Sequence, residues 1–413
     1  MQKLEDVVIP MRQKLSRVKL LSGTNDFALL QNQKVLPPFD NLILNFLVRL
    51  SKVLFESKEA QKFSDIVAFA FFCRKANLNS IEKKYNDISD SSLGKGIIFH
   101  VTPSNVPINF AYSLIMGLLA GNICIVKVSS KEFPQTEIVC NAINLVLKDK
   151  GFEFLNKFLS IIQYNNDDFL NSFFSELCNL RVIWGGDLTI NKIRSAKLPS
   201  RSTDITFADR FSGCIVNAKK YLEDDNKSII AQSFYNDTYL FDQNACSSPS
   251  FIYWLGTKDE INFAKTFFWK ELQLILIKKK YEVQPMIASE KLMTAYRAAI
   301  EMDGVSSRVI DSNLIFRFNL NKLPRNLHSF KQSGGFFYEF SSENIEDLFE
   351  QMSTKFQTLT YIGFDGSILK NKILDAGVQG VDRIVRCGDS MTFNPIWDGV
   401  DLIRQMSRII DYR

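Results

Sequence analysis

Cys246 is the residue whose local sequence best suits nucleophilic chemistry. It lies in the polar turn 243–249, which reads QNACSSP and leads into the apolar run 251–255. A cysteine in such a turn is partly exposed, and its own N–H can point at the atom that the sulfur attacks. We therefore predict that Cys246 is a nucleophile. The alternative is an inert thiol, because neither of the two histidines, His100 and His328, is an obvious base for it.

A second candidate is Asn105, in the segment 103–107, which reads PSNVP. Two prolines restrict the backbone of this turn, so the asparagine amide can be aimed at one fixed point. A fixed amide is a suitable donor to an oxyanion, and we predict this role for Asn105. The alternative is that Asn105 only forms a turn at the entrance of the following helix.

Lys127 stands near the end of the apolar run 123–128, and Ser129 and Ser130 follow it with no acid. Dinucleotide-binding folds that select NAD place a carboxylate against the adenosine ribose, whereas a phosphorylated ribose requires a cation nearby. Lys127, Ser129 and Ser130 therefore predict NADPH as the cofactor. A solvated lysine beside two loop serines would have the same sequence.

Gly185 and Gly186 precede a helix that is expected to begin at Asp187. Glycines in this position let the backbone approach a pyrophosphate at the positive end of the helix. We expect both glycines to bind the cofactor. Glycines before helices also serve merely as turns, and the fingerprint Gly-x-Gly-x-x-Gly is absent from the chain.

These residues follow short apolar strands that alternate with helices. The expected strands are 96–101, 123–128, 160–164 and 181–184, and the expected helices are 107–120, 134–148, 167–178 and 187–196. This alternation indicates a parallel sheet covered on both faces, that is, a doubly wound α/β domain. Ligands bind beyond the carboxyl ends of the strands in such sheets, where Asn105, Ser129 and Gly185 stand. The pattern changes near Asp204, where we expect a second domain to begin.

The composition excludes several classes of protein. With 50 Lys and Arg against 45 Asp and Glu, the basic residues are few and spread out, which disfavours a nucleic-acid binder. Seven cysteines without a C-x-x-C pair, and only two histidines, argue against a disulfide framework and a metal site. Glu5, Asp6 and Arg12 without an apolar segment do not form a secretory signal, and the longest apolar stretch, 106–126, is interrupted. We expect a cytoplasmic protein without a membrane span.

Together, the motifs resemble the aldehyde dehydrogenase superfamily, and within it the acyl-CoA reductases of the LuxC type. Residues 103–107 match the superfamily's Pro-x-Asn-x-Pro oxyanion motif, and residues 121–127 match its Gly-Asn…Lys cofactor strand. Residues 243–249 match the catalytic cysteine loop of the reductase branch. Residues 383–386, followed by 397–402, are similar to the C-terminal signature of that branch.

The resemblance implies an aldehyde dehydrogenase-like fold with a doubly wound cofactor-binding domain and an α/β catalytic domain. Helical spacing of apolar residues in the first part of the chain predicts a helical, peripheral region 1–90 packed on the cofactor domain. The other expected parts are a dinucleotide-binding domain 91–205, a catalytic domain 206–375 with the cysteine, and a C-terminal segment 376–413. The resemblance also implies NADPH-dependent reduction of a fatty acyl thioester, either acyl-CoA or an acylated protein, to the aldehyde. Relatives work with an adenylating acyl-protein synthetase, so the resemblance implies such a partner, and superfamily members often form homo-oligomers.

One departure from the superfamily bears on the reaction. Hydrolytic aldehyde dehydrogenases use a glutamate to activate the water that cleaves the acyl-enzyme, and Phe207 stands at the corresponding position here. Without that base, a thioester on Cys246 survives to be reduced or passed to a thiol, which favours acyl reduction over aldehyde oxidation. An alternative is an acyltransferase or acyl carrier that forms the same thioester without hydride transfer. His100 is either a proton relay or a structural residue.

Overall fold

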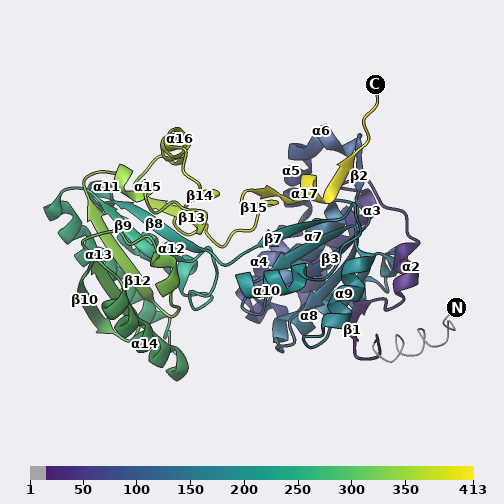
Figure 1. Cartoon of the computed structure of the whole chain (residues 1–413), viewed down its shortest axis with the longest axis horizontal. Helices are drawn as coiled ribbons and strands as arrows, with labels where there is room; N and C mark the ends of the chain where they lie inside the picture. Colours follow the sequence, from purple (N-terminus) through teal and green to yellow (C-terminus); the bar gives the residue numbers. More distant parts are fainter. Residues whose placement is uncertain (1–14) are drawn as a thin grey trace. The chain divides into compact units, whose positions relative to one another are not determined.

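The computed structural model describes residues 15–413, with the backbone alone for residues 310 and 311. The chain divides into two compact units (Figure 1). Unit 1 comprises the residues up to Ala208 together with Phe393–Arg413, and unit 2 comprises Asp209–Thr392. The expectation that the chain has no secretory signal rests on residues 5–12, which lie outside the described residues.

Unit 1 is built on a six-stranded sheet. Its strands, in spatial order, are β1 (Lys19–Gly23), β5 (Leu159–Gln163), β4 (Ile123–Val128), β3 (Ile97–Val101), β6 (Leu180–Trp184) and β7 (Thr203–Phe207). β1 runs antiparallel to β5, and the other neighbours are parallel. The strand order reverses at β3, because β4 and β5 lie on one side of it and β6 and β7 on the other. This confirms the doubly wound fold, and it places the expected ligand crevice at the carboxyl ends of the strands around β3.

Helices connect the parallel strands of unit 1. The helices of this unit are α2 (Phe27–Gln31), α3 (Asn41–Glu56), α4 (Ser64–Phe72), α5 (Lys75–Glu82), α6 (Asn86–Ser89), α7 (Asn109–Leu119), α8 (Pro134–Val146), α9 (Asp168–Leu177), α10 (Asp187–Arg194) and α17 (Leu402–Met406). Right-handed crossovers put α7 and α8 on one face of the sheet and α9 and α10 on the other. α3 packs against α7 and α8. Both faces of the sheet are therefore covered.

The strands and helices expected between residues 96 and 196 are present, with ends shifted by one or two residues. The helix expected from Pro107 begins at Asn109. The reason is a preceding turn, in which the Asn109 N–H donates to the Val106 carbonyl at 3.1 Å. The segment that carries Asn105 is consequently a loop with its own turn rather than the first turn of a helix.

Among residues 15–90, the expected helices are present as α2 to α6, but this part of the chain is not peripheral. β1 extends the sheet of unit 1, and α3 buries Phe46 and Leu47 completely in the main core. β1 has only five residues, and its register shifts between Leu20 and Ser22. A strand this short and irregular lacks the regular alternation of apolar and polar residues from which strands are predicted. This region is part of the sheet and of its core.

The C-terminal segment 393–413 belongs to unit 1. β17 (Ser407–Ile409) pairs antiparallel with β2 (Ser92–Gly94). The buried amide of Asn122 joins the two parts of the chain, because its Oδ1 accepts two N–H groups just before β3 and its Nδ2 donates to the Met406 carbonyl at 2.9 Å. Asn122, part of the motif that resembles a cofactor strand, therefore has a structural role.

The C-terminal signature residues also build structure in unit 1. β15 (Ile396–Trp397) and β16 (Val400–Asp401) form a hairpin, and both turn residues, Asp398 and Gly399, have positive φ. The Asp401 carboxylate caps α17 and accepts the Tyr85 hydroxyl at 3.1 Å. This part of the signature thus joins the C-terminal segment to Tyr85, just before β2.

Unit 2 contains a seven-stranded sheet. Its strands, in spatial order, are β10 (Val305–Ser312), β11 (Ile315–Leu320), β12 (Phe336–Ser342), β9 (Pro249–Leu255), β8 (Phe211–Asn217), β13 (Phe356–Ile362) and β14 (Arg383–Arg386). Its helices are α11 (Ala218–Glu223), α12 (Lys227–Thr238), α13 (Lys258–Lys278), α14 (Pro285–Glu301), α15 (Glu346–Phe349) and α16 (Gly366–Ala376). β10 and β11 are antiparallel, and the other neighbours are parallel.

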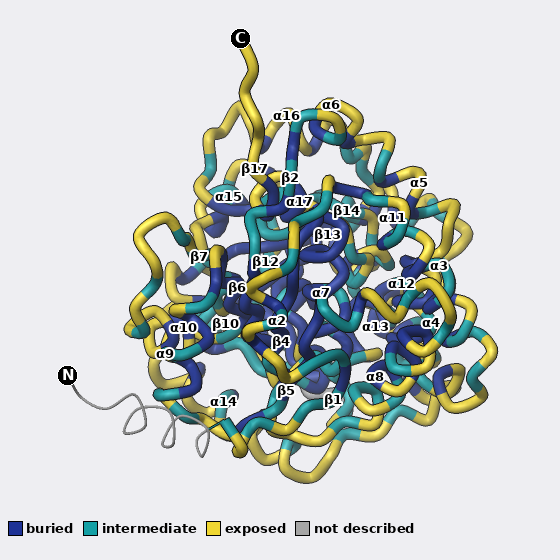
Figure 2. Tube along the Cα trace, turned by 90° about the vertical axis from the view of Figure 1, so that its right-hand side faces the viewer, coloured by how far each residue is buried: buried dark blue, intermediate teal, exposed yellow. Residues whose placement is uncertain are grey.

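Both faces of the unit 2 sheet are buried. Alternate residues of β9 enter two separate apolar clusters, with Phe251 beside residues of α14 and Ile252 beside residues of α13. Figure 2 shows buried residues concentrated in the strands and exposed residues in the outer turns and loops. Among residues 15–413, no helix combines the length and the apolarity needed to cross a bilayer.

His100 is fully buried in β3. Its Nδ1 lies 2.8 Å from the Ser113 hydroxyl, which also accepts the Trp184 indole N–H at 3.1 Å. Its Nε2 has no hydrogen-bond partner. Burial lowers the pKa of His100 to about 3, so the ring is neutral at pH 7. These contacts favour the structural interpretation of His100 over the proton relay.

The buried ring predicts a pH dependence of stability. The unfolded histidine binds a proton near its usual pKa of about 6.5, whereas the folded one does not until about pH 3, so acid favours unfolding between these values. We expect the free energy of unfolding to fall by roughly 2 kcal/mol more for the wild type than for His100→Gln between pH 7.5 and pH 5. Urea unfolding at both pH values measures this difference. Equal losses in the two proteins would contradict it.

Candidate active site

Cys246 precedes β9 at the amino-terminal edge of the parallel strands of unit 2. Of the seven cysteines, Cys246 and Cys387 are partly exposed and the other five are buried. The Cys246 carbonyl accepts the Ser212 hydroxyl at 2.7 Å, and the same hydroxyl accepts the Thr358 N–H at 3.1 Å. The backbone of the cysteine is thus tied to β8 and β13, while its side chain remains accessible.

Gln243 fixes the start of the same turn. Its side chain is buried and makes four hydrogen bonds. Its Oε1 accepts the N–H groups of Gly335 and Phe336, both at 2.9 Å, and its Nε2 donates to the carbonyls of Pro249 and Phe336 at 2.8 and 3.0 Å. Because Pro249 begins β9, one amide group holds both ends of the cysteine turn against the start of β12.

The chain enters this turn through strained backbone. Asp242 and Gln243 have φ angles of 50° and 60°, in the left-handed region that non-glycine residues rarely adopt. Such residues cost about 1 to 3 kcal/mol each and persist where surrounding contacts over-determine them. Here the contacts include the Gln243 amide and the Tyr281 hydroxyl, which donates to Asp242 at 2.8 Å. Backbone strain of this kind concentrates at functional sites.

Replacing Gln243 with methionine tests this arrangement. We expect the free energy of unfolding to fall by about 3 to 5 kcal/mol, because buried N–H and C=O groups lose their partners and the strained backbone loses its support. Denaturant titration measures the change. The control is Gln232→Met on α12, where the amide makes a single, partly buried hydrogen bond to Asn236, and we expect a change below about 0.5 kcal/mol. Comparable losses in both variants would contradict the assignment.

Loop 387–392, from another part of unit 2, also contacts the cysteine turn. The Ser247 hydroxyl donates to the Met391 sulfur of this loop at 3.4 Å. Asp237 accepts two backbone N–H groups of this loop, and Arg383 donates to the carbonyls of Ser390 and Thr392 at 3.0 Å each. Burial raises the pKa of Asp237 to about 6. Arg383, part of the C-terminal signature, therefore supports the neighbourhood of Cys246.

Asn105 lies in unit 1, in the loop that follows β3. Its side chain is exposed, and the N-cap position of α7 is occupied by Ile108. Asn105 thus lies in the turn region that precedes the helix and is not its N-cap residue, so its role as an oxyanion donor stays a prediction. Its loop leaves the carboxyl end of the strand at which the order of the sheet reverses.

Lys127 lies near the end of β4, next to β3. Its ammonium group sits 4.9 Å from the centre of the Tyr164 ring, and burial lowers its pKa from the usual value. No carboxylate of the described residues is within ion-pair distance of it. The side chain is thus a half-buried cation without a counter-ion, not the solvated lysine of the alternative interpretation. Ser129 and Ser130 follow at the same edge, and Ser129 is partly exposed while Ser130 is exposed.

Gly185 and Gly186 follow β6, on the other side of β3. Neither has positive φ, and a Cβ atom on Gly186 would meet nothing within 4 Å, so the fold itself does not require a glycine there. The three strand ends that carry Asn105, Lys127 and these glycines are neighbours in one sheet. The structure thus gathers all the candidate residues of unit 1 at one edge.

Phe207 ends β7, directly beside β6. Its ring is buried and stacks on Trp184, with 3.7 Å between the ring centres. Trp184 in turn donates to Ser113, which contacts His100. Phe207, which stands where the resemblance places the water-activating glutamate of hydrolytic aldehyde dehydrogenases, is thus part of an apolar stack.

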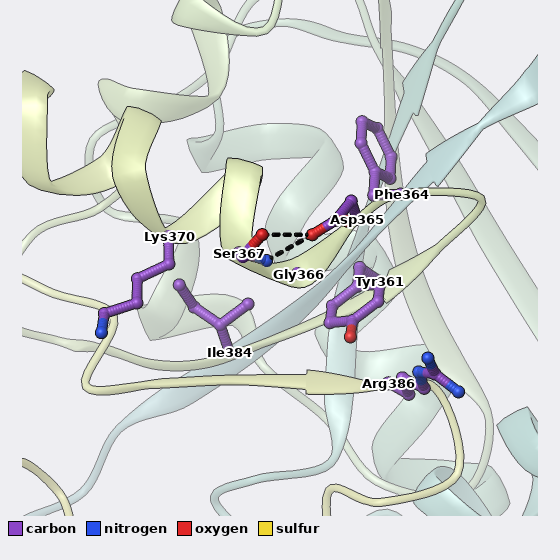
Figure 3. A pocket seen from close by; sticks show the side chains of 8 residues that line it. All are labelled: Tyr361, Phe364, Asp365, Gly366, Ser367, Lys370, Ile384 and Arg386. Atoms are coloured by element: carbon purple, nitrogen blue, oxygen red, sulfur yellow. Dashed lines mark hydrogen bonds between the residues drawn. The ribbon is translucent and has the colours of Figure 1, made fainter.

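A separate cavity of about 580 Å³ opens at the carboxyl ends of β13 and β14 (Figure 3). Lys370 and Arg386 lie at its opposite ends, and the Asp365 carboxylate accepts the N–H groups of Ser367 and Ile368 at the start of α16. Cys246 precedes a parallel strand and so lies at the other edge of the sheet. This cavity is therefore not part of the candidate active site. Within residues 15–413, no cluster of three or more potential metal ligands is present.

The structure resembles solved aldehyde dehydrogenases. A lactaldehyde dehydrogenase matches with a TM-score of 0.63 at 10% sequence identity, over 92% of this chain and 88% of that one. Glyceraldehyde-3-phosphate dehydrogenase GapN from Methanocaldococcus jannaschii, solved with NADP, matches with a TM-score of 0.59 at 13% identity, over 93% and 90% of the two chains. These matches confirm the aldehyde dehydrogenase-like fold.

Two similar proteins are both named long-chain acyl-protein thioester reductase. The protein from Photorhabdus laumondii is 24% identical over 342 residues, which cover 77% of this chain and 63% of the relative. The one from Vibrio harveyi is 23% identical over 336 residues, which cover 77% and 64%. The chain thus spans less than two thirds of the length of these relatives.

A family model described as acyl-CoA reductase (LuxC) matches residues 32–305, which is more than half of the chain. The matched range contains Asn105, Lys127 and Cys246. The chain belongs to the acyl-CoA reductase (LuxC) family.

Proposed function

We propose that this chain reduces a long-chain acyl thioester to the aldehyde through a covalent thioester on Cys246, with NADPH as the reductant. The observation that carries the proposal is the turn around Cys246, where a partly exposed thiol follows strained backbone held by the four hydrogen bonds of Gln243. An inert thiol needs no such support. The names of the relatives supply the substrate class, a long-chain acyl thioester.

In the first step, the Cys246 sulfur attacks the carbonyl carbon of the acyl donor and forms a carbon–sulfur bond. The carbonyl oxygen becomes an oxyanion, to which we assign the Asn105 amide and the Cys246 N–H as donors. The tetrahedral intermediate then expels the thiolate of the donor, which takes up a proton in place of the one lost by Cys246. One such donor contributes about 3 to 4 kcal/mol in comparable sites.

Lys127, Ser129, Ser130, Gly185 and Gly186 are the residues that would hold the cofactor. They fit NADPH, because Lys127 is a half-buried cation without a carboxylate partner among the described residues, and a ribose phosphate supplies the missing negative charge. Bound NADPH supplies the hydride that reduces the acyl group.

The residue at position 207 bears on hydrolysis of the thioester, the reaction that would compete with reduction. The buried Phe207 ring cannot accept a proton from water, so this residue does not promote hydrolysis of the thioester. The same feature suits an acyltransferase or acyl carrier, which also needs a lasting thioester. The two functions differ in whether a nucleotide is consumed.

The acyl donor is acyl-CoA or an acylated protein, and an adenylating acyl-protein synthetase is the class of enzyme that would supply the acyl group. We place the reaction in the cytoplasm, because seven free cysteines suit a reducing compartment. We also expect a homo-oligomer, as in other members of the superfamily.

Optical measurement of NADPH oxidation with decanoyl- and tetradecanoyl-CoA tests the proposal. We expect NADPH to be consumed with an equal amount of aldehyde formed. Acylation of the protein without nucleotide consumption would overturn the reductase assignment and favour the acyltransferase or carrier. Preference for NADH would overturn the assignment of the cofactor.

A further inference from the structure

Lys291, on α14, has a fully buried side chain in unit 2. Burying an ammonium group is costly unless it is paired, and lysine is among the residue types least often buried. The Lys291 amine donates to the carbonyls of Asn313 and Gly334, at 2.6 Å each, and lies 4.3 Å from the centre of the Phe316 ring. Burial lowers the pKa of Lys291 to about 8, so the amine is still charged at pH 7. The charged Lys291 amine thus makes hydrogen bonds to neutral carbonyl groups.

One of these carbonyls belongs to the peptide that supports Gln243. The Gly334 carbonyl and the Gly335 N–H are the two ends of one peptide unit. The carbonyl accepts Lys291, and the N–H donates to Gln243 Oε1 at 2.9 Å. A cation at the oxygen polarises the peptide and strengthens the hydrogen bond that its N–H makes. Lys291 therefore acts directly on the group that holds Gln243.

The hydrogen bonds continue from Gln243 to the cysteine turn. The amide of Gln243 that accepts Gly335 donates, through Nε2, to the Pro249 carbonyl at 2.8 Å. The Gly334 N–H donates to the Asp242 carbonyl at 2.9 Å, which supports the strained residue just before Gln243. A continuous chain of dipoles thus runs from the buried ammonium to both ends of the turn that presents Cys246.

The conformation of Gly334 and Gly335 makes their peptide planes dependent on contacts of this kind. Gly334 and Gly335 have φ angles of 75° and 83°, and a Cβ atom on Gly335 would lie 2.1 Å from the Leu314 carbonyl oxygen. A left-handed pair of glycines is conformationally permissive, so its peptide planes need outside contacts to hold one orientation. The two groups that hold the central plane are Lys291 on its oxygen and Gln243 on its N–H.

We propose that Lys291 is a positioning residue for Cys246, which acts by orienting the Gly334–Gly335 peptide and, through it, Gln243. The inference rests on the proposed function for its kinetic consequence, while its structural part stands apart from any activity. Removal of the ammonium group releases the peptide, loosens the cysteine turn and slows formation of the acyl-enzyme.

The test compares Lys291→Met with Lys265→Met. Lys265, on α13, is also largely buried, and its amine donates to Asn319 at 3.1 Å and lies 3.9 Å from Glu339; neither residue is a hydrogen-bond partner of the Gln243 amide. We expect Lys291→Met to speed amide hydrogen exchange in residues 241–248 and 334–337 by roughly tenfold or more, while Lys265→Met leaves these residues unchanged. Unchanged exchange in Lys291→Met, or the same increase in both variants, would overturn the proposal.

Kinetics provide the second readout. We expect Lys291→Met to lower kcat by between about tenfold and hundredfold with little change in KM, and Lys291→Arg, which keeps the charge, to recover part of the rate. A rise in KM with unchanged kcat would overturn the positioning role. If Lys291→Met does not fold, Lys291→Gln is measured in the same way. If the wild type forms no acyl-enzyme, the proposed function fails, while hydrogen exchange still decides the role of Lys291.

Discussion

Replacing Cys246 with alanine is expected to lower kcat/KM for aldehyde formation by roughly four orders of magnitude or more. The reason is that the acyl group has no other place to bind covalently, and removal of a catalytic nucleophile has effects of this size in comparable enzymes. The turn itself should persist, because the contacts that hold it use the Cys246 carbonyl rather than its sulfur. Steady-state kinetics of NADPH oxidation, with a thermal melt of the same sample, measure both points.

Cys387→Ala is the matched control for this experiment. Cys387 is the other cysteine that is not fully buried as a residue, but its thiol is buried, and a hydrogen bond with Cys214 together with that burial raises its pKa well above the usual value. A protonated thiol is a poor nucleophile, so we expect Cys387→Ala to retain most of the activity. Loss of activity in Cys387→Ala with retention in Cys246→Ala would move the nucleophile to position 387.

Asn105→Ala is expected to lower kcat by about a hundredfold to a thousandfold with little change in KM. Loss of one donor to the oxyanion removes an interaction made mainly in the transition state, which amounts to roughly 3 to 4 kcal/mol. Asn105→Asp should be worse than Asn105→Ala, because a carboxylate repels the developing negative charge. The measurement is the dependence of the rate on the concentration of acyl-CoA.

Ser104→Ala is the control for Asn105, because Ser104 is its exposed neighbour in the same turn. We expect this variant to change kcat by less than about twofold, in line with surface substitutions elsewhere. If Asn105→Ala raises KM and leaves kcat unaltered, Asn105 contributes to ground-state binding instead of stabilising an oxyanion.

The sequence predicted the parts of the fold that rest on local patterns. Apolar runs such as 123–128 and 181–184 coincide with β4 and β6 to within one residue, because strands that are buried on both faces have few polar interruptions. The positions of Lys127 and Gly185 at the carboxyl ends of these strands were therefore predicted as well, while their binding of a cofactor stays a prediction. β1 was missed because an irregular edge strand of five residues carries no such pattern.

The support of the candidate site could not be predicted in the same way. Gln243 contacts Phe336, 93 positions further along the chain, and Lys291 contacts Gly334, 43 positions away. Such pairings depend on the order of strands in the sheet of unit 2, which local patterns do not determine. In the sequence, Gln243 is one polar residue in a polar turn, and Lys291 is one lysine on a helix. Only the fold distinguishes them from their solvated neighbours.

The central claim is that Cys246 carries the acyl group. Intact-mass analysis after incubation with tetradecanoyl-CoA, without a nucleotide, tests it most directly. The account predicts that the wild type gains the mass of one acyl group, that the added mass is lost on treatment with hydroxylamine, and that Cys246→Ala gains none. Labelling of Cys246→Ala to the same extent as the wild type would contradict it.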